Sequence, residues 1–208
     1  MKGFFITGTG TGIGKTYFSA LLARWFRAQG QRVRYIKPVA TGYPEDDDAA
    51  FVAERAGLAP EDAVTLFTAS EPASPCFVFD PFPFDEAVAR IEALAADRDV
   101  VLVESAGGLA VPLGQGRYNY HFALALPLPT LLVLPNRLGC LSDAMAYGQL
   151  AMGRKVEFYG WARNDYFAES ERCRARNAAM LETMFPGRTR YVYDSQGLET
   201  VAPAGVAG

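Results

Sequence analysis

The stretch that most constrains this fold is a glycine-rich loop between an apolar run and an amphipathic segment. Phe4-Phe5-Ile6 precedes Gly8-Thr9-Gly10-Thr11-Gly12-Ile13-Gly14-Lys15-Thr16, and an apolar segment with helical period follows. Glycines let successive backbone N–H groups turn toward one anion, and the N-terminus of the next helix adds its positive dipole there. The pattern therefore predicts a phosphate-binding loop at a strand-to-helix turn.

The sequence of this loop matches the nucleotide-binding motifs of two enzyme classes. The Walker template G-x-x-x-x-G-K-[ST] requires a glycine where the chain has Thr9, so the loop is a variant in which Lys15 meets phosphate and Thr16 meets Mg²⁺. Residues 7–14 also fit T-G-x-x-x-G-I-G, which is similar to the nucleotide loop of short-chain dehydrogenases. A flexible glycine turn without a ligand is the remaining interpretation.

Composition favours one α/β domain over residues 1–208. Half of the residues are hydrophobic, which is enough for one well-filled core in a chain of this length. The net charge of -3 and the dispersed arginines argue against nucleic acid or a membrane as partner, so we expect small-molecule substrates. No apolar stretch reaches the roughly 18 residues of a membrane span, and no signal peptide precedes the first strand, which predicts a cytoplasmic location.

The cysteines and the histidine form no metal or catalytic pattern. Cys76, Cys140 and Cys173 lie far apart without C-x-x-C spacing, which predicts neither a disulfide framework nor a zinc site. His121 is the only histidine, so we expect it at the surface or at an interface.

Apolar runs alternate with helical stretches along the chain. Strands are predicted at residues 4–7, 33–37, 100–104, 130–134, 156–162 and 190–193, and helices at 16–28, 47–56, 85–96, 142–152 and 170–184. This alternation predicts a mostly parallel sheet with helices on both faces. Gly30, Gly57 and Gly187 are expected to end helices, and the proline-rich stretches 71–75 and 80–83 to form ordered loops.

Two of the four lysines stand at predicted strand ends, where an open α/β sheet binds its ligand. Lys15 follows the first strand and Lys37 closes the second. A dinucleotide site needs an acidic residue near Lys37, and a short-chain dehydrogenase needs a Tyr-x-x-x-Lys pattern, which no lysine here has. Phosphate chemistry is therefore favoured, and the alternative for Lys37 is an exposed strand-end lysine.

Carboxylates at the same edge predict a magnesium site. Glu104 ends an apolar run at the place where P-loop proteins hold Mg²⁺ or its water shell. Of Asp46, Asp47 and Asp48, two are expected to begin a helix and one to complete the Mg²⁺ shell. Mg²⁺ keeps several waters and needs few protein carboxylates.

Two further strand ends carry polar groups. Gly139-Cys140-Leu141-Ser142 opens the helix after the fourth run, and free N–H groups there predict a second anion site suited to a carboxylate-bearing substrate. Asn164 follows the fifth run and is able to donate and accept at once, as purine edges require. A turn or cap role is the equal alternative for Asn164.

Together these motifs resemble the dethiobiotin synthetase family, the ATP-dependent carboxylases of biotin synthesis. The similarity runs from Met1 to Asp165. Besides the glycine loop and the acidic patch ending at Asp48, the motifs that agree in order and spacing are Lys37-Pro38-Val39-Ala40-Thr41-Gly42, Glu71-Pro72-Ala73-Ser74-Pro75, Glu104 with Ala106-Gly107-Gly108, Leu138-Gly139-Cys140, and Gly160-Trp161 with Asn164-Asp165. The most specific of them are Lys-Pro-Val, Glu-Pro-x-Ser-Pro and the Leu-Gly-Cys turn.

The resemblance implies a P-loop NTPase-like fold, ATP and Mg²⁺ as cofactors, and 7,8-diaminononanoate and CO₂ as substrates. Their products would be dethiobiotin, ADP and phosphate, formed through a carbamate and a carbamic-phosphoric anhydride. It also implies a homodimer whose active site spans the interface.

Site residues are implied by the same resemblance. Lys15 and Lys37 would flank the transferring phosphoryl group, and Thr11 and Thr41 would bind carbamate or phosphate oxygens. The implied nucleotide contacts are Gly12, Ile13, Gly14, Lys15, Thr16, Tyr17 and Asn164, the last against adenine; the implied metal ligands are Thr16, Asp48 and Glu104. The implied substrate contacts are Thr41, Gly107 and Gly108, with Leu138, Gly139, Cys140, Leu141 and Ser142 from the neighbouring subunit.

The chain departs from the family pattern at several places. Ser105 stands where the family usually has glycine, Arg137 and the stretch 118–121 are unusual, and the tail 197–208 aligns poorly with the segment that covers the adenine ring and ribose. We expect the serine to narrow its loop.

Three alternatives stay open. Cobyrinate a,c-diamide synthases share the loop but carry a glutaminase domain, for which this chain has neither length nor nucleophile motif. Partition ATPases of the ParA/MinD type carry a lysine five residues before the catalytic one, where this chain has Gly10. A degenerate nucleotide binder without turnover is the third.

Overall fold

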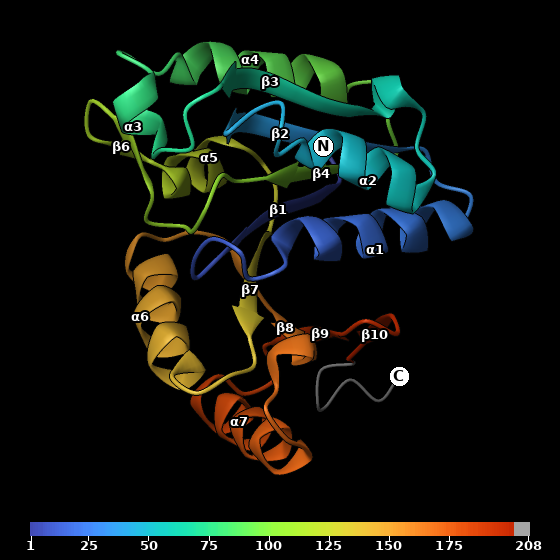
Figure 1. Ribbon diagram of the computed structural model, residues 1–208, viewed down its shortest axis with the longest axis vertical. Helices are drawn as coiled ribbons and strands as arrows, with labels where there is room; N and C mark the ends of the chain where they lie inside the picture. The colour runs from blue at the N-terminus through green and yellow to red at the C-terminus, as the bar shows by residue number, and fades with distance from the viewer. Residues whose placement is uncertain (202–208) are drawn as a thin grey trace.

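A computed structural model of the chain describes residues 1–201 and shows a large, mostly parallel sheet flanked by helices (Figure 1). Its strands are β1 (Gly3–Gly8), β2 (Val33–Thr41), β3 (Ala63–Ala69), β4 (Val100–Glu104), β7 (Thr130–Pro135), β8 (Phe158–Asn164), β9 (Thr189–Tyr193) and β10 (Leu198–Thr200). They lie in the order β10-β9-β8-β7-β1-β4-β2-β3, and only β9 and β10 pair antiparallel. The predicted α/β class and mostly parallel sheet are confirmed.

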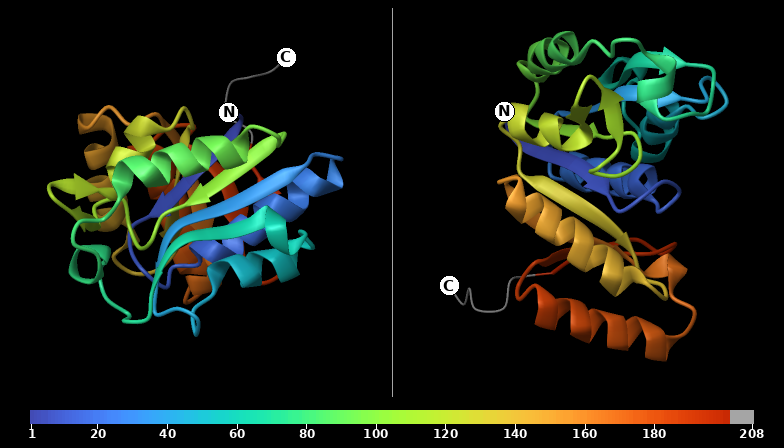
Figure 2. Two further views of the ribbon diagram at one scale, coloured as in Figure 1. Left: turned by 90° about the horizontal axis from the view of Figure 1, so that it is seen from above. Right: turned by 90° about the vertical axis from the view of Figure 1, so that its left-hand side faces the viewer.

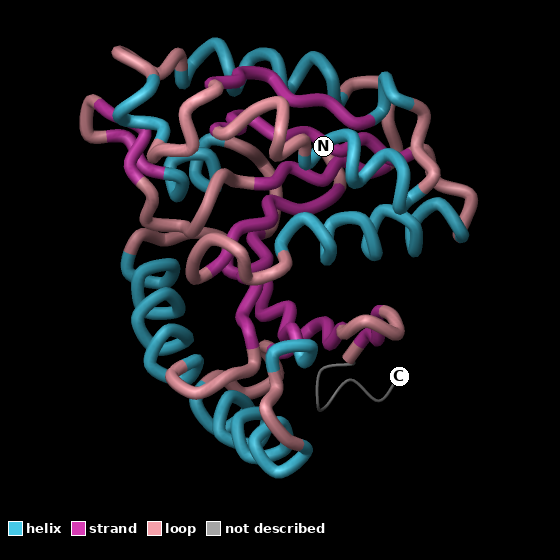
Figure 3. Tube along the Cα trace, in the orientation of Figure 1, coloured by secondary structure: helices cyan, strands magenta, loops and turns pink. Residues whose placement is uncertain are grey.

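Helices cover both faces of the sheet (Figures 2 and 3). They are α1 (Lys15–Ala28), α2 (Asp48–Ala56), α3 (Pro75–Val78), α4 (Phe84–Ala95), α5 (Asn119–Ala125), α6 (Cys140–Gly153) and α7 (Glu171–Met184), with 3-10 turns η1 (Pro60–Asp62) and η2 (Asp165–Phe167). Helices α1 and α2 pack into one buried cluster, and α4, α5, α6 and α7 pack into another. None of the helices within residues 1–201 is long and apolar enough to cross a membrane.

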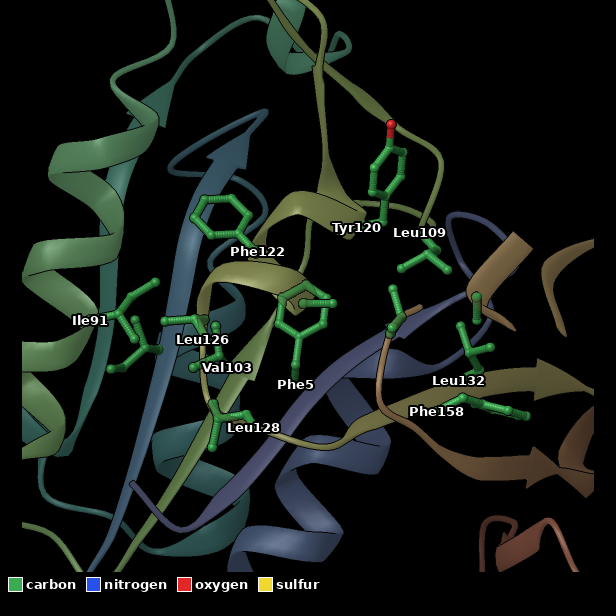
Figure 4. Packing of buried hydrophobic residues seen from close by; sticks show 14 of the residues in the cluster. Phe5, Ile91, Val103, Leu109, Tyr120, Phe122, Leu126, Leu128, Leu132 and Phe158 are labelled. Atoms are coloured by element: carbon green, nitrogen blue, oxygen red, sulfur yellow. The ribbon is translucent and has the colours of Figure 1, made fainter. Parts of the chain in front are cut away.

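Alternating strand residues fill these two clusters. Phe5 points into the cluster that contains Phe122 and Ile91, whereas the next residue, Ile6, belongs to the cluster on α1. The Phe5 and Phe122 rings lie 6.4 Å apart between centroids (Figure 4). Because strands buried on both faces read as continuous apolar runs, the central strands were recognisable in the sequence.

All six predicted strands and five predicted helices exist, with ends that differ by up to a few residues. The largest difference is in β2, which continues past Lys37 to Thr41. Pro38 lies inside this strand, and the pairing with β3 passes from Lys37 opposite Thr65 to Val39 opposite Phe67. A proline without N–H therefore does not end the strand, since β3 pairs on both sides of it.

The sequence interpretation missed several short or partly exposed elements. These are the strands β3 and β10, the helices α3 and α5, the two 3-10 turns, and a separate hairpin of β5 (Pro112–Gly114) and β6 (Arg117–Tyr118). β3 is an edge strand with mixed burial, so its alternation is weak. The expected helix ends are confirmed at Gly57, the left-handed C-cap of α2, and near Gly30 and Gly187, which have positive φ.

The strand order places the predicted site at one edge. β1 lies between β4 and β7, and β2 lies next to β4, so the carboxyl ends of these parallel strands meet. The glycine loop, Glu104 and the end of β2 are thus neighbours in space. Part of the poorly aligned tail, residues 202–208, lies outside the described residues.

Candidate functional site

A cleft of about 870 Å³ opens above the glycine loop. Its wall includes eleven of the predicted site residues: Thr11, Gly12, Gly14, Lys15, Thr16, Tyr17, Lys37, Thr41, Asp48, Glu104 and Gly107. Strand β1 and helix α1 hold the loop between them, and Gly12 and Gly14 take φ values of 68° and 92°. These left-handed conformations favour glycine and let the loop curve around an anion.

Lys37 lies in the cleft between two carboxylates. Its Nζ is 2.6 Å from Asp48 Oδ2 and 2.9 Å from Glu104 Oε1, and its side chain is only 5% exposed. Lys37 is therefore not the exposed strand-end lysine of the alternative interpretation. Lys15 Nζ donates to the Gly10 carbonyl at 2.7 Å, within the same loop.

Glu104 is fully buried and fixed by four side chains. Oε1 faces Lys37 and Thr16, whose Oγ1 lies at 3.0 Å, and Oε2 accepts from Ser19 Oγ at 2.7 Å and Tyr35 Oη at 3.1 Å. Ser19 and Tyr35 were absent from the sequence interpretation. Their positions in the sequence could have identified them. Ser19 lies one helical turn after Thr16, and Tyr35 lies two residues before Lys37 on the same strand, so each shares a face with a predicted site residue.

Burial and charge shift the pKa values in the cleft. Burial lowers the pKa of Lys15 to about 8, partly offset by Glu104. Burial also disfavours the charged form of Lys37, but Glu104 and Asp48 outweigh it and raise the pKa of that amine. Burial disfavours ionised Asp48 as well, yet Lys37 and Thr16 hold its pKa below the ordinary value. The cleft thus stabilises a charged Lys37 beside an ionised Asp48.

The predicted magnesium ligands converge. Thr16 Oγ1 lies 2.7 Å from Asp48 Oδ1 and 3.0 Å from Glu104 Oε1, so a hydroxyl and two carboxylates meet at one point. This oxygen donor set fits Mg²⁺, which prefers hard ligands and keeps waters. Among residues 1–201, no group of three histidine, cysteine or acidic side chains forms a complete metal cage. Asp47 instead caps α2 by accepting from the Ala50 N–H at 3.0 Å, as expected for one of the three acids.

The remaining loop residues border the cleft without all entering it. Gly107 has φ 66°, and a Cβ there would lie 3.4 Å from Thr11 Oγ1, so glycine brings this loop against the phosphate loop. Gly108 is buried underneath, where a Cβ would lie 2.9 Å from the Gly8 carbonyl oxygen. Ser105 is also buried, with its Oγ 2.7 Å from Thr7 Oγ1 and its backbone carbonyl 3.4 Å from Lys37 Nζ.

The turn at residues 138–142 does not line the cleft of its own chain. Leu138 is 84% exposed, and Gly139 is the left-handed N-cap of α6. The N–H groups of Cys140 and Ser142 are already bonded within the turn, to Arg137 and Gly139 carbonyls at 3.1 and 3.0 Å. Gly139 and Leu141 are left to offer N–H groups to a ligand.

Asn164 and His121 lie beside or away from the cleft. Asn164 is buried; Nδ2 donates to the Ile13 carbonyl at 3.0 Å, and Oδ1 accepts from the Tyr166 N–H at 3.2 Å. Both polar groups are engaged within the chain, so the adenine contact of Asn164 stays a prediction. His121 is partly exposed at the start of α5, where Nδ1 accepts from the Tyr118 N–H at 2.9 Å.

Comparison with known proteins places this geometry in a family. A family model described as an AAA domain matches residues 2–189. The ATP-dependent dethiobiotin synthetase BioD of Xylella fastidiosa strain 9a5c is 34% identical over 205 residues, which cover 89% of this chain and 87% of that protein. BioD of Haloferax mediterranei is 35% identical, covering 87% of this chain and 79% of its own length.

Solved structures share the fold at low identity. The signal recognition particle receptor FtsY of Elizabethkingia anophelis, in complex with GDP, superposes with a TM-score of 0.57 at 18% identity over 97% of this chain and 61% of its own. MinD of Aquifex aeolicus gives 0.55 at 16% identity over 93% and 82%. These similarities confirm the P-loop NTPase-like fold. The sequence relatives identify the family within that fold. The chain is a nucleotide-binding member of the ATP-dependent dethiobiotin synthetase family.

Proposed function

We propose that the protein uses MgATP to carboxylate 7,8-diaminononanoate with CO₂ and to close the cyclic urea, giving dethiobiotin, ADP and phosphate. The observation that carries the proposal is the placement of Lys37 in the phosphate cleft beside Lys15, between Asp48 and Glu104. The named function of the relatives supports the same reaction. We place the reaction in the cytoplasm, as the sequence predicts.

The reaction gathers negative charge at each step, and the residues of the cleft match that need. An amine of the substrate attacks CO₂ and loses a proton to give a carbamate. A carbamate oxygen attacks the γ-phosphorus of ATP and ADP leaves; the second amine then attacks the carbonyl carbon, and phosphate leaves as the ring closes. In this proposal Lys15 and Lys37 stabilise the transferring phosphoryl group, and Thr11 and Thr41 hydrogen-bond carbamate or phosphate oxygens.

The metal site completes this arrangement. Thr16, Asp48 and Glu104 would hold Mg²⁺, which supplies charge neutralisation at the nucleotide phosphates when bound. Ser19 and Tyr35 fix the far oxygen of Glu104 at 2.7 and 3.1 Å, so its near oxygen stays directed at the cleft.

We further propose a homodimer in which residues 138–142 bind the substrate carboxylate in the partner's cleft. The turn does not line the cleft of its own chain, and Leu138 is highly exposed. The Gly139 and Leu141 N–H groups suit a carboxylate at the start of a 14-residue helix. The partition-ATPase alternative gains no support, because Gly10 stands where that class has its signature lysine.

Product analysis tests the proposal. The protein is incubated with MgATP, 7,8-diaminononanoate and ¹³C-bicarbonate, and the product is identified by mass spectrometry. Dethiobiotin carrying one ¹³C in its urea carbon is expected. Absence of labelled dethiobiotin, with folded protein that binds ATP, would contradict the proposed reaction.

A further inference from the structure

Two buried side chains on adjacent strands reach the back of the phosphate loop. Asn164 on β8 and Tyr193 on β9 are register partners, so they lie side by side at the sheet edge. Asn164 Nδ2 donates to the Ile13 carbonyl at 3.0 Å, and Tyr193 Oη donates to the Gly14 carbonyl at 3.1 Å. Neighbouring strands thus hold two consecutive peptide groups of the loop.

These bonds help to fix the orientation of the two peptides, and the Gly14 carbonyl also accepts from the Phe18 N–H of α1 at 2.9 Å. In a trans peptide the carbonyl of one residue and the N–H of the next lie in one plane and point in opposite directions. Holding the Ile13 and Gly14 carbonyls toward the sheet therefore turns the N–H groups of Gly14 and Lys15 the other way. Both of these residues line the cleft.

Packing keeps this arrangement rigid. Asn164 is 3% exposed and Tyr193 2%, and the Tyr193 ring lies 5.2 Å from the Phe18 ring of α1. A Cβ on Gly14 would meet Asn164 Nδ2 at 2.4 Å and Tyr193 Oη at 3.1 Å, so only glycine allows this approach. Burial raises the pKa of Tyr193, which keeps its phenol protonated as a hydrogen-bond donor.

We propose that Asn164 and Tyr193 are positioning residues that preorganise the phosphate-binding N–H groups of Gly14 and Lys15. The inference rests on the proposed function only in taking a nucleoside triphosphate as the ligand. It gives Asn164 a role on the phosphates, through Ile13, in addition to the contact with the base that the family resemblance implies. Phosphate binding therefore depends on strands β8 and β9 as well as on the loop itself.

The two roles of Asn164 are separated by ligands with and without adenine. Binding of MgATP, MgGTP and magnesium tripolyphosphate is measured by titration calorimetry for wild type, Tyr193→Phe and Asn164→Ala. Tyr193→Phe removes one hydrogen bond and is expected to weaken all three ligands about fivefold. Asn164→Ala removes a bond and support for the loop, and is expected to weaken all three about tenfold.

Tyr191→Phe is the matched control. Tyr191 lies on the same strand and packs against the same Phe18 ring, at 5.5 Å, but its hydroxyl makes no hydrogen bond to the loop. It is expected to bind all three ligands like wild type, and thermal unfolding confirms that each variant is folded.

Two results would overturn the inference. Loss of ATP affinity in Asn164→Ala with unchanged tripolyphosphate affinity would restrict the role of Asn164 to the base. Equal ligand affinities for Tyr193→Phe and Tyr191→Phe would show that Tyr193 does not position the loop. Because no diamine is present, these outcomes are independent of whether dethiobiotin is the product.

Discussion

The ammonium group of Lys37 lies 2.9 Å from Oε1 of Glu104, a carboxylate with no solvent exposure. A buried pair of this kind is stable only when further groups satisfy both charges. Asp48 supplies a second carboxylate to the amine, and Ser19 and Tyr35 bond the far oxygen of Glu104. The pair is therefore a fixed part of the cleft, and it holds the amine of Lys37 near the phosphate loop.

Replacing Lys37 by alanine should abolish most turnover and leave nucleotide binding largely intact. The lost charge acts on the transferring phosphoryl group, and removal of one such electrostatic contact costs on the order of a thousandfold in kcat. Steady-state kinetics and ATP titration measure the two effects. Lys2→Ala, which removes an exposed lysine, is the control and should behave like wild type. Unchanged kcat in Lys37→Ala would remove Lys37 from the mechanism.

Asp48→Asn should raise the Mg²⁺ concentration needed for half-maximal turnover by about tenfold, because one of two carboxylates is lost from a site of few ligands. Asp46→Asn is the matched control, since Asp46 is an exposed acid of the same cleft wall. Chelation of Mg²⁺ should stop the wild-type reaction. Equal Mg²⁺ dependence in the two variants would show that Asp48 is not a ligand.

The buried amine of Lys15 makes the free energy of unfolding rise with pH in the alkaline range. Its pKa is about 8 in the folded protein and 10.5 in the unfolded chain, so between these values the unfolded state binds more protons. Stability then rises with pH from 8 to 10.5, and below pH 8 the cost of burying the charged amine is present in full.

Lys15→Met should remove this rise. The difference in unfolding free energy between wild type and variant is expected to change by about 1–3 kcal/mol over that pH range. Urea unfolding without nucleotide, at steps across the range, measures it. Parallel curves for the two proteins would show that the pKa of Lys15 is not lowered.

The shared active site is tested by mixing two inactive variants. Lys37→Ala damages the cleft of one subunit, and Gly139→Asp places a negative charge on the turn that serves the other. In a mixed dimer one site has both defects and the other has none, so randomly exchanged dimers should regain about a quarter of wild-type activity. Mixtures that stay inactive, although sedimentation shows exchanged dimers, would place the complete site within one chain.

Much of the fold was predictable because the central strands are continuous apolar runs. β4 was predicted with its observed ends, residues 100–104, since both of its faces are buried. β3 was not predicted, because it is an edge strand whose side chains are only partly buried. Short elements such as β10 depend on pairing with β9, and local sequence does not contain that information.

The site was predictable where spacing along the chain implies proximity. The sequence placed Lys37 and Glu104 at strand ends and Asp48 at a helix start on one sheet edge, and the structure brings all three within hydrogen-bond distance although β2 continues past Lys37. The hydrogen bond from Tyr193 to Gly14 joins residues 179 positions apart, and no local sequence pattern predicts it. Asn164 was singled out correctly as a strand-end residue, but its bond to Ile13 required the strand order β7-β8-β9.

The most direct test of the proposed synthetase reaction is to measure ADP release with each reactant omitted in turn. MgATP, bicarbonate and 7,8-diaminononanoate together should give rapid ADP release, and omission of any one should reduce it to background, because the phosphoryl acceptor is a carbamate formed from the other two. ADP release at the same rate without the diamine would contradict the synthetase assignment and identify a different ATPase.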